Sequence, residues 1–157
     1  MKEPSVIHHT FTLERSYPVS PEQVFAALAD PAKRRRWLLE GQSHEVEHFE
    51  MDFRVGGHER GLLRFGPDTP FPGTLLTREG DFQDIVLNER IVSSSSMKIG
   101  DRRISVSLET YDLLATGKGT ELIFTHQAAF FEGADGPGMR EDGWRKLLGK
   151  LEAEIAR

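Results

Sequence analysis

The chain has 157 residues, of which 38% are hydrophobic and 29% charged, and this composition is typical of one folded domain rather than a disordered segment. A net charge of -5 disfavours nucleic-acid binding, and the absence of cysteine excludes disulfides, thiolate zinc sites and cysteine nucleophiles. Without an apolar leader or a stretch long enough to span a membrane, the sequence predicts a single cytoplasmic domain over residues 1–157.

A strand and two short helices are the first predicted elements. Residues 6–17 alternate between apolar and polar side chains, which favours a half-buried strand. Residues 20–23 carry the capping-box pattern of a helix start, and Asp30-Pro31 repeats a start signal for a second helix that ends near Trp37. The basic run at residues 33–36 lies in this second helix, and we interpret it as a solvated face rather than an anion or nucleic-acid site.

Six further strands are predicted in the middle of the chain, separated by turns rich in glycine, proline or asparagine. They cover residues 45–55, 58–65, 74–86, 90–99, 103–114 and 120–130. The fifth of these strands has two apolar phases, since Ile104, Val106 and Leu108 share one phase whereas Tyr111 and Leu113 share the other. We therefore expect a β-bulge between Leu108 and Tyr111. Hairpin links between consecutive strands imply an antiparallel sheet.

The carboxyl-terminal segment is the strongest predicted helix, with start signals at residues 135–137. Its apolar stripe consists of Trp144, Leu147, Leu148, Leu151 and Ile155. Because no other helix is long and amphipathic, the apolar face of the sheet must bury against this one. The expected architecture is α+β, with a curved antiparallel sheet of six to seven strands around the helix and a cavity between them. Gly143 and Gly149 would permit close approach to the sheet or leave room for a ligand.

Four segments carry a resemblance to a known family. They are residues 15–37, 52–57, 119–126 and 143–151. In this order they resemble the SRPBCC or START-like (Bet v 1-like) superfamily, and within it the Aha-type, polyketide cyclase-like branch named for the activator of the 90-kDa heat-shock-protein ATPase. The resemblance implies a helix-grip fold with a hydrophobic cavity and no cofactor. It leaves the function open, because the superfamily includes lipid carriers, hormone receptors and cyclases.

Inward-facing side chains of the predicted sheet and helices are the candidate lining of a ligand pocket. The candidates are Trp37, Phe49, Met51, Phe53, Glu59, Leu63, Phe65, Ser95, Met97, Tyr111, Phe124, His126, Phe130 and Trp144. Ser93 and Ser95 would either enlarge the pocket or bond a ligand. The alternative is that most of these side chains simply form the core that a domain of this length requires.

His126, Glu59 and Tyr111 are the candidates for acid–base chemistry. His126 shares the phase of the apolar side chains around it, so we expect a buried imidazole that either orients a ligand or is a core histidine. An inward Glu59 would serve as a general acid or base, or would pair with an arginine, for which Arg15 is the candidate. Glu109 faces inward only if the bulge precedes it.

A metal site is not expected from the histidines at positions 44, 48 and 58. Residues four apart on a strand, such as His44 and His48, are roughly 13 Å apart and cannot share one ion. The sequence also lacks the Gly-x-Ser-x-Gly, phosphate-loop and dinucleotide-binding motifs.

Three functions therefore stay open. The preferred interpretation is a binding protein for a small hydrophobic or aromatic molecule. The alternatives are a cofactor-free cyclase, dehydratase or hydrolase acting on polyketide-like compounds, and a co-chaperone that stimulates a heat-shock chaperone ATPase.

Overall fold

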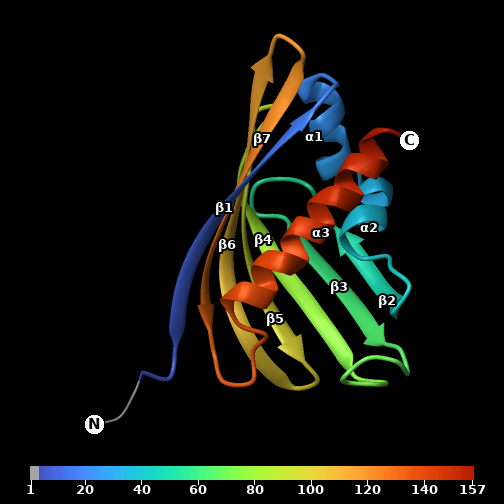
Figure 1. Cartoon of the computed structure of the whole chain (residues 1–157), viewed down its shortest axis with the longest axis vertical. Coiled ribbons are helices and arrows are strands. Elements are labelled where there is room, and N and C mark those ends of the chain that lie inside the picture. Colours follow the sequence, from blue (N-terminus) through green and yellow to red (C-terminus); the bar gives the residue numbers. More distant parts are fainter. Residues whose placement is uncertain (1–3) are drawn as a thin grey trace.

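A computed structural model describes residues 4–157. Residues 1–3, which the predicted domain includes and on which the expectation of no apolar leader partly depends, lie outside the described residues. Within 4–157 the chain forms one seven-stranded antiparallel sheet and three helices, and the sheet curves around the long helix α3 (Figure 1). The bounds in chain order are β1 Ile7–Tyr17, α1 Pro21–Ala29, α2 Pro31–Leu38, β2 His44–Met51, β3 His58–Phe65, β4 Leu75–Val86, β5 Arg90–Ile99, β6 Arg102–Thr116, β7 Gly119–Phe130 and α3 Pro137–Ile155.

The strand order is β1-β7-β6-β5-β4-β3-β2, in which every strand from β2 to β7 lies beside its sequence neighbour. β1 pairs with β7, so β1 and β2 are the two edge strands of the sheet. This arrangement confirms the predicted α+β helix-grip fold. In the described part of the chain, no helix is both long and apolar enough to cross a membrane.

The two short helices begin where the capping signals predict. The Ser20 side chain accepts a hydrogen bond from the Gln23 backbone N–H at 3.3 Å, and Gln23 accepts one from the Ser20 backbone at 3.4 Å. The Asp30 side chain caps α2 by accepting a hydrogen bond from the Lys33 backbone N–H at 3.0 Å. The indole N–H of Trp37 donates to the Ala27 carbonyl at 2.8 Å and ties α2 to α1. Both helices lie beside the carboxyl-terminal half of α3 (Figure 1).

The core lies between α3 and the concave face of the sheet. The helix contributes Trp144, Leu148 and Leu151, all buried as the apolar stripe predicts. The facing strand β7 contributes every second residue, and these are Leu122, Phe124, His126, Ala128 and Phe130. The alternation therefore identified the inward face of β7 correctly.

The predicted bulge in β6 was placed too late in the strand. The β5–β6 register shifts at Ile104, near the start of the strand, and alternation is unbroken afterwards. Val106 and Leu108 consequently lie on the outer face with 43% and 36% of their surface exposed. Glu109 faces inward together with Tyr111, and both are buried. Apolar character misled the prediction here, because polar side chains occupy the concave face of this strand.

Gly80 on β4 allows the close approach of β5, and we expect its replacement by alanine to be costly. An added Cβ would lie 1.9 Å from the Ser94 carbonyl oxygen, which belongs to the backbone and cannot rotate away. We expect Gly80→Ala to lower the free energy of unfolding by about 3 kcal/mol in urea denaturation. Gly117→Ala, where no atom lies within 4 Å of the added Cβ, should change it by at most about 0.5 kcal/mol. Equal effects of the two substitutions would contradict this account.

Candidate functional site

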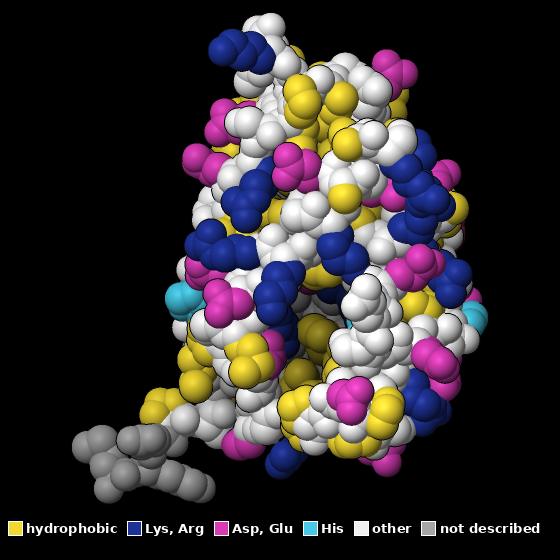
Figure 2. All heavy atoms as spheres, turned by 45° about the vertical axis from the view of Figure 1, so that its right-hand side comes forward, with side chains coloured by type: hydrophobic (Ala, Val, Ile, Leu, Met, Phe, Trp, Pro, Cys, Tyr) yellow, Lys and Arg dark blue, Asp and Glu magenta, His cyan; other side chains and the backbone are white. Residues whose placement is uncertain are grey.

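A pocket of about 360 Å³ lies between the amino-terminal half of α3 and strands β3, β4 and β5. This volume falls in the range of small-molecule sites. Figure 2 shows the hollow in the lower half of the molecule, with hydrophobic side chains at its bottom. The apolar lining consists of Leu38, Leu39, Leu63, Phe65, Leu76, Met97, Met139, Trp144 and Leu147. The polar lining consists of His44, Arg78, Asp135, Arg140 and Lys146.

Four of the predicted pocket residues line this hollow, and they are Leu63, Phe65, Met97 and Trp144. A second group is buried outside that lining, and it consists of Trp37, Glu59, Ser95, Tyr111, Phe124, His126 and Phe130. A third group is half-buried around and after the edge strand β2, and it consists of Phe49, Met51 and Phe53. The strand predicted to reach Val55 ends at Met51, so Phe53 lies beyond it.

Several lining residues were missed by sequence reasoning. Arg78 and Arg140 are buried in spite of their charge, and the exposed Met139 lies in the first turn of α3. A signal for Arg78 existed, because it shares a phase with Leu76 and Phe82 on the inward face of β4. Gly143 and Gly149 have open space where a Cβ would be, so they do not serve close approach to the sheet.

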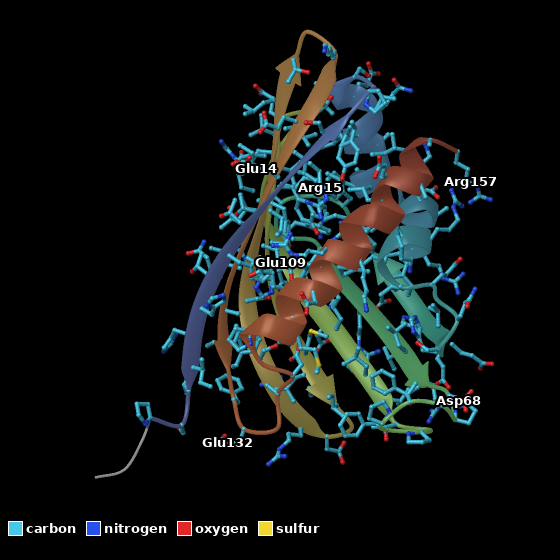
Figure 3. The ribbon with its side chains drawn as sticks, in the orientation of Figure 1. Glu14, Arg15, Asp68, Glu109, Glu132 and Arg157 are labelled. Carbon is cyan, nitrogen blue, oxygen red and sulfur yellow. The ribbon has the colours of Figure 1, made fainter. Side chains whose placement is uncertain are left out.

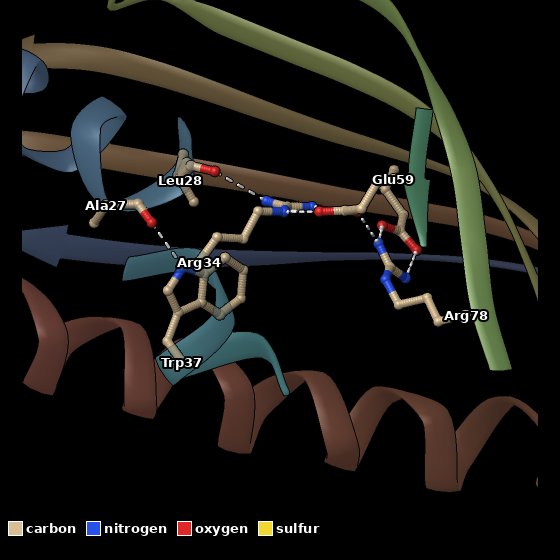
Figure 4. Close-up of polar contacts among 7 residues, drawn as sticks. Ala27, Leu28, Arg34, Trp37, Glu59 and Arg78 are labelled. Carbon is tan, nitrogen blue, oxygen red and sulfur yellow. Dashed lines mark hydrogen bonds and ion pairs between the residues drawn. The ribbon is translucent and has the colours of Figure 1, made fainter. Parts of the chain in front are cut away.

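A buried chain of ion pairs crosses the concave face next to the pocket (Figure 4). Arg34 on α2 is completely buried, and its guanidinium donates two hydrogen bonds to Glu59 on β3 and one to the Leu28 carbonyl at 3.2 Å. Arg78 on β4 donates to both carboxylate oxygens of Glu109 on β6, at 2.6 and 2.9 Å. The two ion pairs are joined by a third contact, in which Arg78 Nη2 lies 3.7 Å from Glu59 Oε1.

Two predictions about charged residues are wrong. Arg15 is not the partner of Glu59, because its guanidinium donates to the neighbouring Glu14 carbonyl at 2.9 Å. The run at residues 33–36 is not uniformly solvated, because Arg34 is buried. The helical position of Arg34 points toward the sheet, where Glu59 on β3 is its acidic partner. Glu59 does face inward, and it pairs with an arginine, Arg34. This pairing is the expected alternative to a role as general acid or base.

Comparison with known proteins identifies the family. The family model described as activator of Hsp90 ATPase homolog 1-like protein matches residues 18–156. The chain belongs to this family. No curated protein matches it.

Solved structures of other proteins share the fold along nearly the whole chain. The Mll3558 protein from Rhizobium loti is 46% identical, with a TM-score of 0.86 over 96% of this chain and 99% of that one. A protein from Rhizobium leguminosarum is 34% identical, with a TM-score of 0.88 over 98% and 97%. An AHSA1-like protein from Aeromonas hydrophila, 17% identical with a TM-score of 0.68 over 94% and 92%, shares the fold alone.

Burial and the buried arginines set the charge states in this family member. Burial opposes ionisation of Glu109, but the Arg78 guanidinium outweighs it and lowers the pKa of Glu109 to about 2. Burial lowers the pKa of His126 to about 4 and raises the pKa of Tyr111 to about 12. At neutral pH, Glu109 is therefore a carboxylate, His126 a neutral imidazole and Tyr111 a protonated phenol.

The surface histidine His58 belongs to a separate acidic cluster. Its Nδ1 lies 3.0 Å from Asp81, and its Nε2 lies 3.6 Å from Glu79. The hydrogen bond with Asp81 raises the pKa of His58. Among residues 4–157, no group of three His, Cys, Asp or Glu side chains could hold a metal ion.

Proposed function

We propose that the chain binds a small hydrophobic or aromatic molecule in the pocket under α3. The observation that carries this proposal is the apolar lining of a hollow of about 360 Å³. Met139 keeps 67% of its surface exposed at the rim, so a ligand there would remove apolar surface from water. Burial of apolar surface is the main driving force for such binding.

A cofactor-free enzyme has weaker support. The carboxylates of Glu59 and Glu109 are engaged by arginines. Burial lowers the pKa of His126 to about 4 and raises the pKa of Tyr111 to about 12. General acid–base catalysis is most efficient when the pKa of the catalytic group lies near the working pH. Stimulation of a chaperone ATPase rests on the family description alone, and an ATPase assay with and without this protein tests it.

The binding proposal is tested by native mass spectrometry and thermal unfolding with a mixed set of lipids, flavonoids and polyketide-like aromatics. We expect at least one compound to bind with 1:1 stoichiometry and to raise the unfolding midpoint. Met97→Trp, which fills the pocket from its β5 side, should weaken binding at least about tenfold. Leu114→Trp adds the same side chain on an exposed part of β6 and should leave binding unchanged. Absence of any bound compound, or tight binding to the folded Met97→Trp variant, would contradict the proposal.

A further inference from the structure

Five buried polar side chains on the concave face have atoms without a hydrogen-bond partner in the protein. In the described residues, these buried atoms are Arg78 Nε, Ser93 Oγ, Ser95 Oγ, Tyr111 Oη and both ring nitrogens of His126. They belong to four adjacent strands, β4 to β7. Buried polar atoms are rarely unpaired, because each unpaired group costs about 1–3 kcal/mol. A cluster of such atoms in one place therefore indicates a site where a bound molecule supplies the missing bonds.

The residues with unpaired atoms lie at and next to the strand positions that face Glu109. In the sheet register, Ser93 on β5 and His126 on β7 both lie directly opposite Glu109 on β6. Tyr111 follows two residues later on the same inward face, and Arg78 is bonded to Glu109 from β4. Figure 3 places Glu109 between the sheet and α3. These side chains therefore form one polar patch, hereafter the inner patch, which consists of Arg78, Ser93, Ser95, Tyr111 and His126.

The inner patch adjoins the apolar pocket. Arg78 belongs to both, and Trp144, which lines the pocket, packs against the patch. The Trp144 ring centre lies 5.8 Å from the guanidinium carbon of Arg78, 6.1 Å from the His126 ring and 6.4 Å from the Tyr111 ring. In Figure 4, Arg78 directs its terminal nitrogens to the carboxylates, which leaves Nε free of them. The pocket and the inner patch therefore meet at Arg78, and Trp144 packs against both.

Charges around the inner patch are already balanced. Each buried arginine has a carboxylate partner, since Arg34 pairs with Glu59, Arg78 with Glu109, and Arg140 with Asp135 at 2.8 Å. A carboxylate from a ligand would therefore lose its hydration without gaining a free buried cation. An uncharged oxygen has a much smaller desolvation cost and needs only hydrogen-bond donors.

All of the unpaired side chains can donate a hydrogen bond, and none of them is restricted to accepting one. Arg78 Nε can only donate, each hydroxyl can donate one bond, and a neutral imidazole donates one bond and accepts one. We propose that the ligand is an uncharged apolar molecule with a carbonyl oxygen, whose body lies in the pocket and whose oxygen accepts hydrogen bonds from the inner patch. This inference rests on the proposed binding function and specifies its ligand class as ketones, aldehydes or esters.

Three matched probes test the ligand class, and they are ethylbenzene, acetophenone and benzoate. They share a phenyl ring and differ in having no oxygen, a carbonyl oxygen or a carboxylate. Dissociation constants are measured at pH 8 from chemical-shift changes of the pocket residues in NMR titrations. We expect acetophenone to bind about three- to tenfold more tightly than ethylbenzene, the gain of one neutral hydrogen bond. Benzoate should bind at least about tenfold more weakly than acetophenone.

Hydroxyl deletions locate the interaction. Ser93→Ala, Ser95→Ala and Tyr111→Phe each remove one donor of the inner patch, and at least one of them should abolish the preference for acetophenone over ethylbenzene. Ser94→Ala is the matched control, because Ser94 lies between the two serines and its hydroxyl accepts a hydrogen bond from Gln83 on the outer face. The control should leave the preference unchanged.

The possible failures are distinguishable. Tighter binding of ethylbenzene than of acetophenone, or tightest binding of benzoate at the rim beside Lys146, would overturn the carbonyl assignment while leaving a functional pocket. A preference for acetophenone that survives all three hydroxyl deletions would overturn the placement of the oxygen at the hydroxyls of the inner patch. No binding of any probe would overturn the pocket proposal and this inference with it.

Discussion

Replacement of Arg34 by methionine is expected to lower the free energy of unfolding by about 3–5 kcal/mol, because it leaves a buried carboxylate without its main partner. Arg34 has no exposed surface, and Glu59 is 5% exposed. The remaining arginine near Glu59, Arg78, is 3.7 Å away and already bonded to Glu109. Urea denaturation at pH 7 measures the change.

Two further variants separate burial of a charge from loss of an arginine. Arg34→Met/Glu59→Leu removes both charges and should recover most of the lost stability, because no uncompensated ion remains. Arg35→Met is the neighbouring control, since Arg35 has 44% of its side chain exposed and lies 3.6 Å from Glu40. It should change stability by less than about 1 kcal/mol. If Arg34→Met were as mild as Arg35→Met, the buried pair would not have the role assigned to it.

Acid is expected to destabilise the protein through His126 between pH 6.5 and about 4. The unfolded chain binds a proton at this histidine near pH 6.5, whereas burial lowers the folded-state pKa to about 4. Above pH 6.5 the histidine is neutral in both the folded and the unfolded state, so it does not change the free energy of unfolding with pH. Below pH 6.5 the unfolded state gains the proton first, so the free energy of unfolding falls, by on the order of 3 kcal/mol when pH 4 is reached.

His126→Phe isolates this effect from the titration of other groups. The charged groups that act on His126 are Glu109, Arg140, Arg78 and Asp135, and all of them remain in the variant. Phenylalanine also suits the stacking on Phe11, whose ring centre lies 4.9 Å from that of His126. The difference in stability between variant and wild type should therefore grow as the pH falls from 6.5 to 4. A difference that is independent of pH would show that His126 has the same pKa in the folded and unfolded states, and would contradict the effect of burial.

The ion-pair chain and the pocket are linked through Arg78. Glu109 holds the terminal nitrogens of Arg78, which fixes the guanidinium beside Trp144 while leaving Nε free. A lysine at this position would keep one charge but lose the two-point contact with Glu109. The buried ion pair with Glu109 therefore holds the unpaired Nε of Arg78 next to the apolar pocket.

Local sequence patterns determined the elements of this fold. The capping signals at residues 20–23 placed the start of α1, because they depend only on residues one helical turn apart. The alternation in β7 gave its inward face, including His126, and the helical spacing of Trp144, Leu148 and Leu151 gave the buried side of α3. The family resemblance then supplied the arrangement of these elements, and the topology agrees with it.

Partners distant in sequence were decided only by the tertiary structure. Four consecutive basic residues look alike in sequence, yet Arg34 alone is buried, because its helical position faces Glu59 on a strand 25 residues later. The bulge at Ile104 depends on the ladder with β5, and it determines that Glu109 faces inward. The pocket likewise arises where α3 crosses β3 to β5, and the inner patch lies beside it on β4 to β7. Local periodicity gives the inward face of each element but not the space left between the elements.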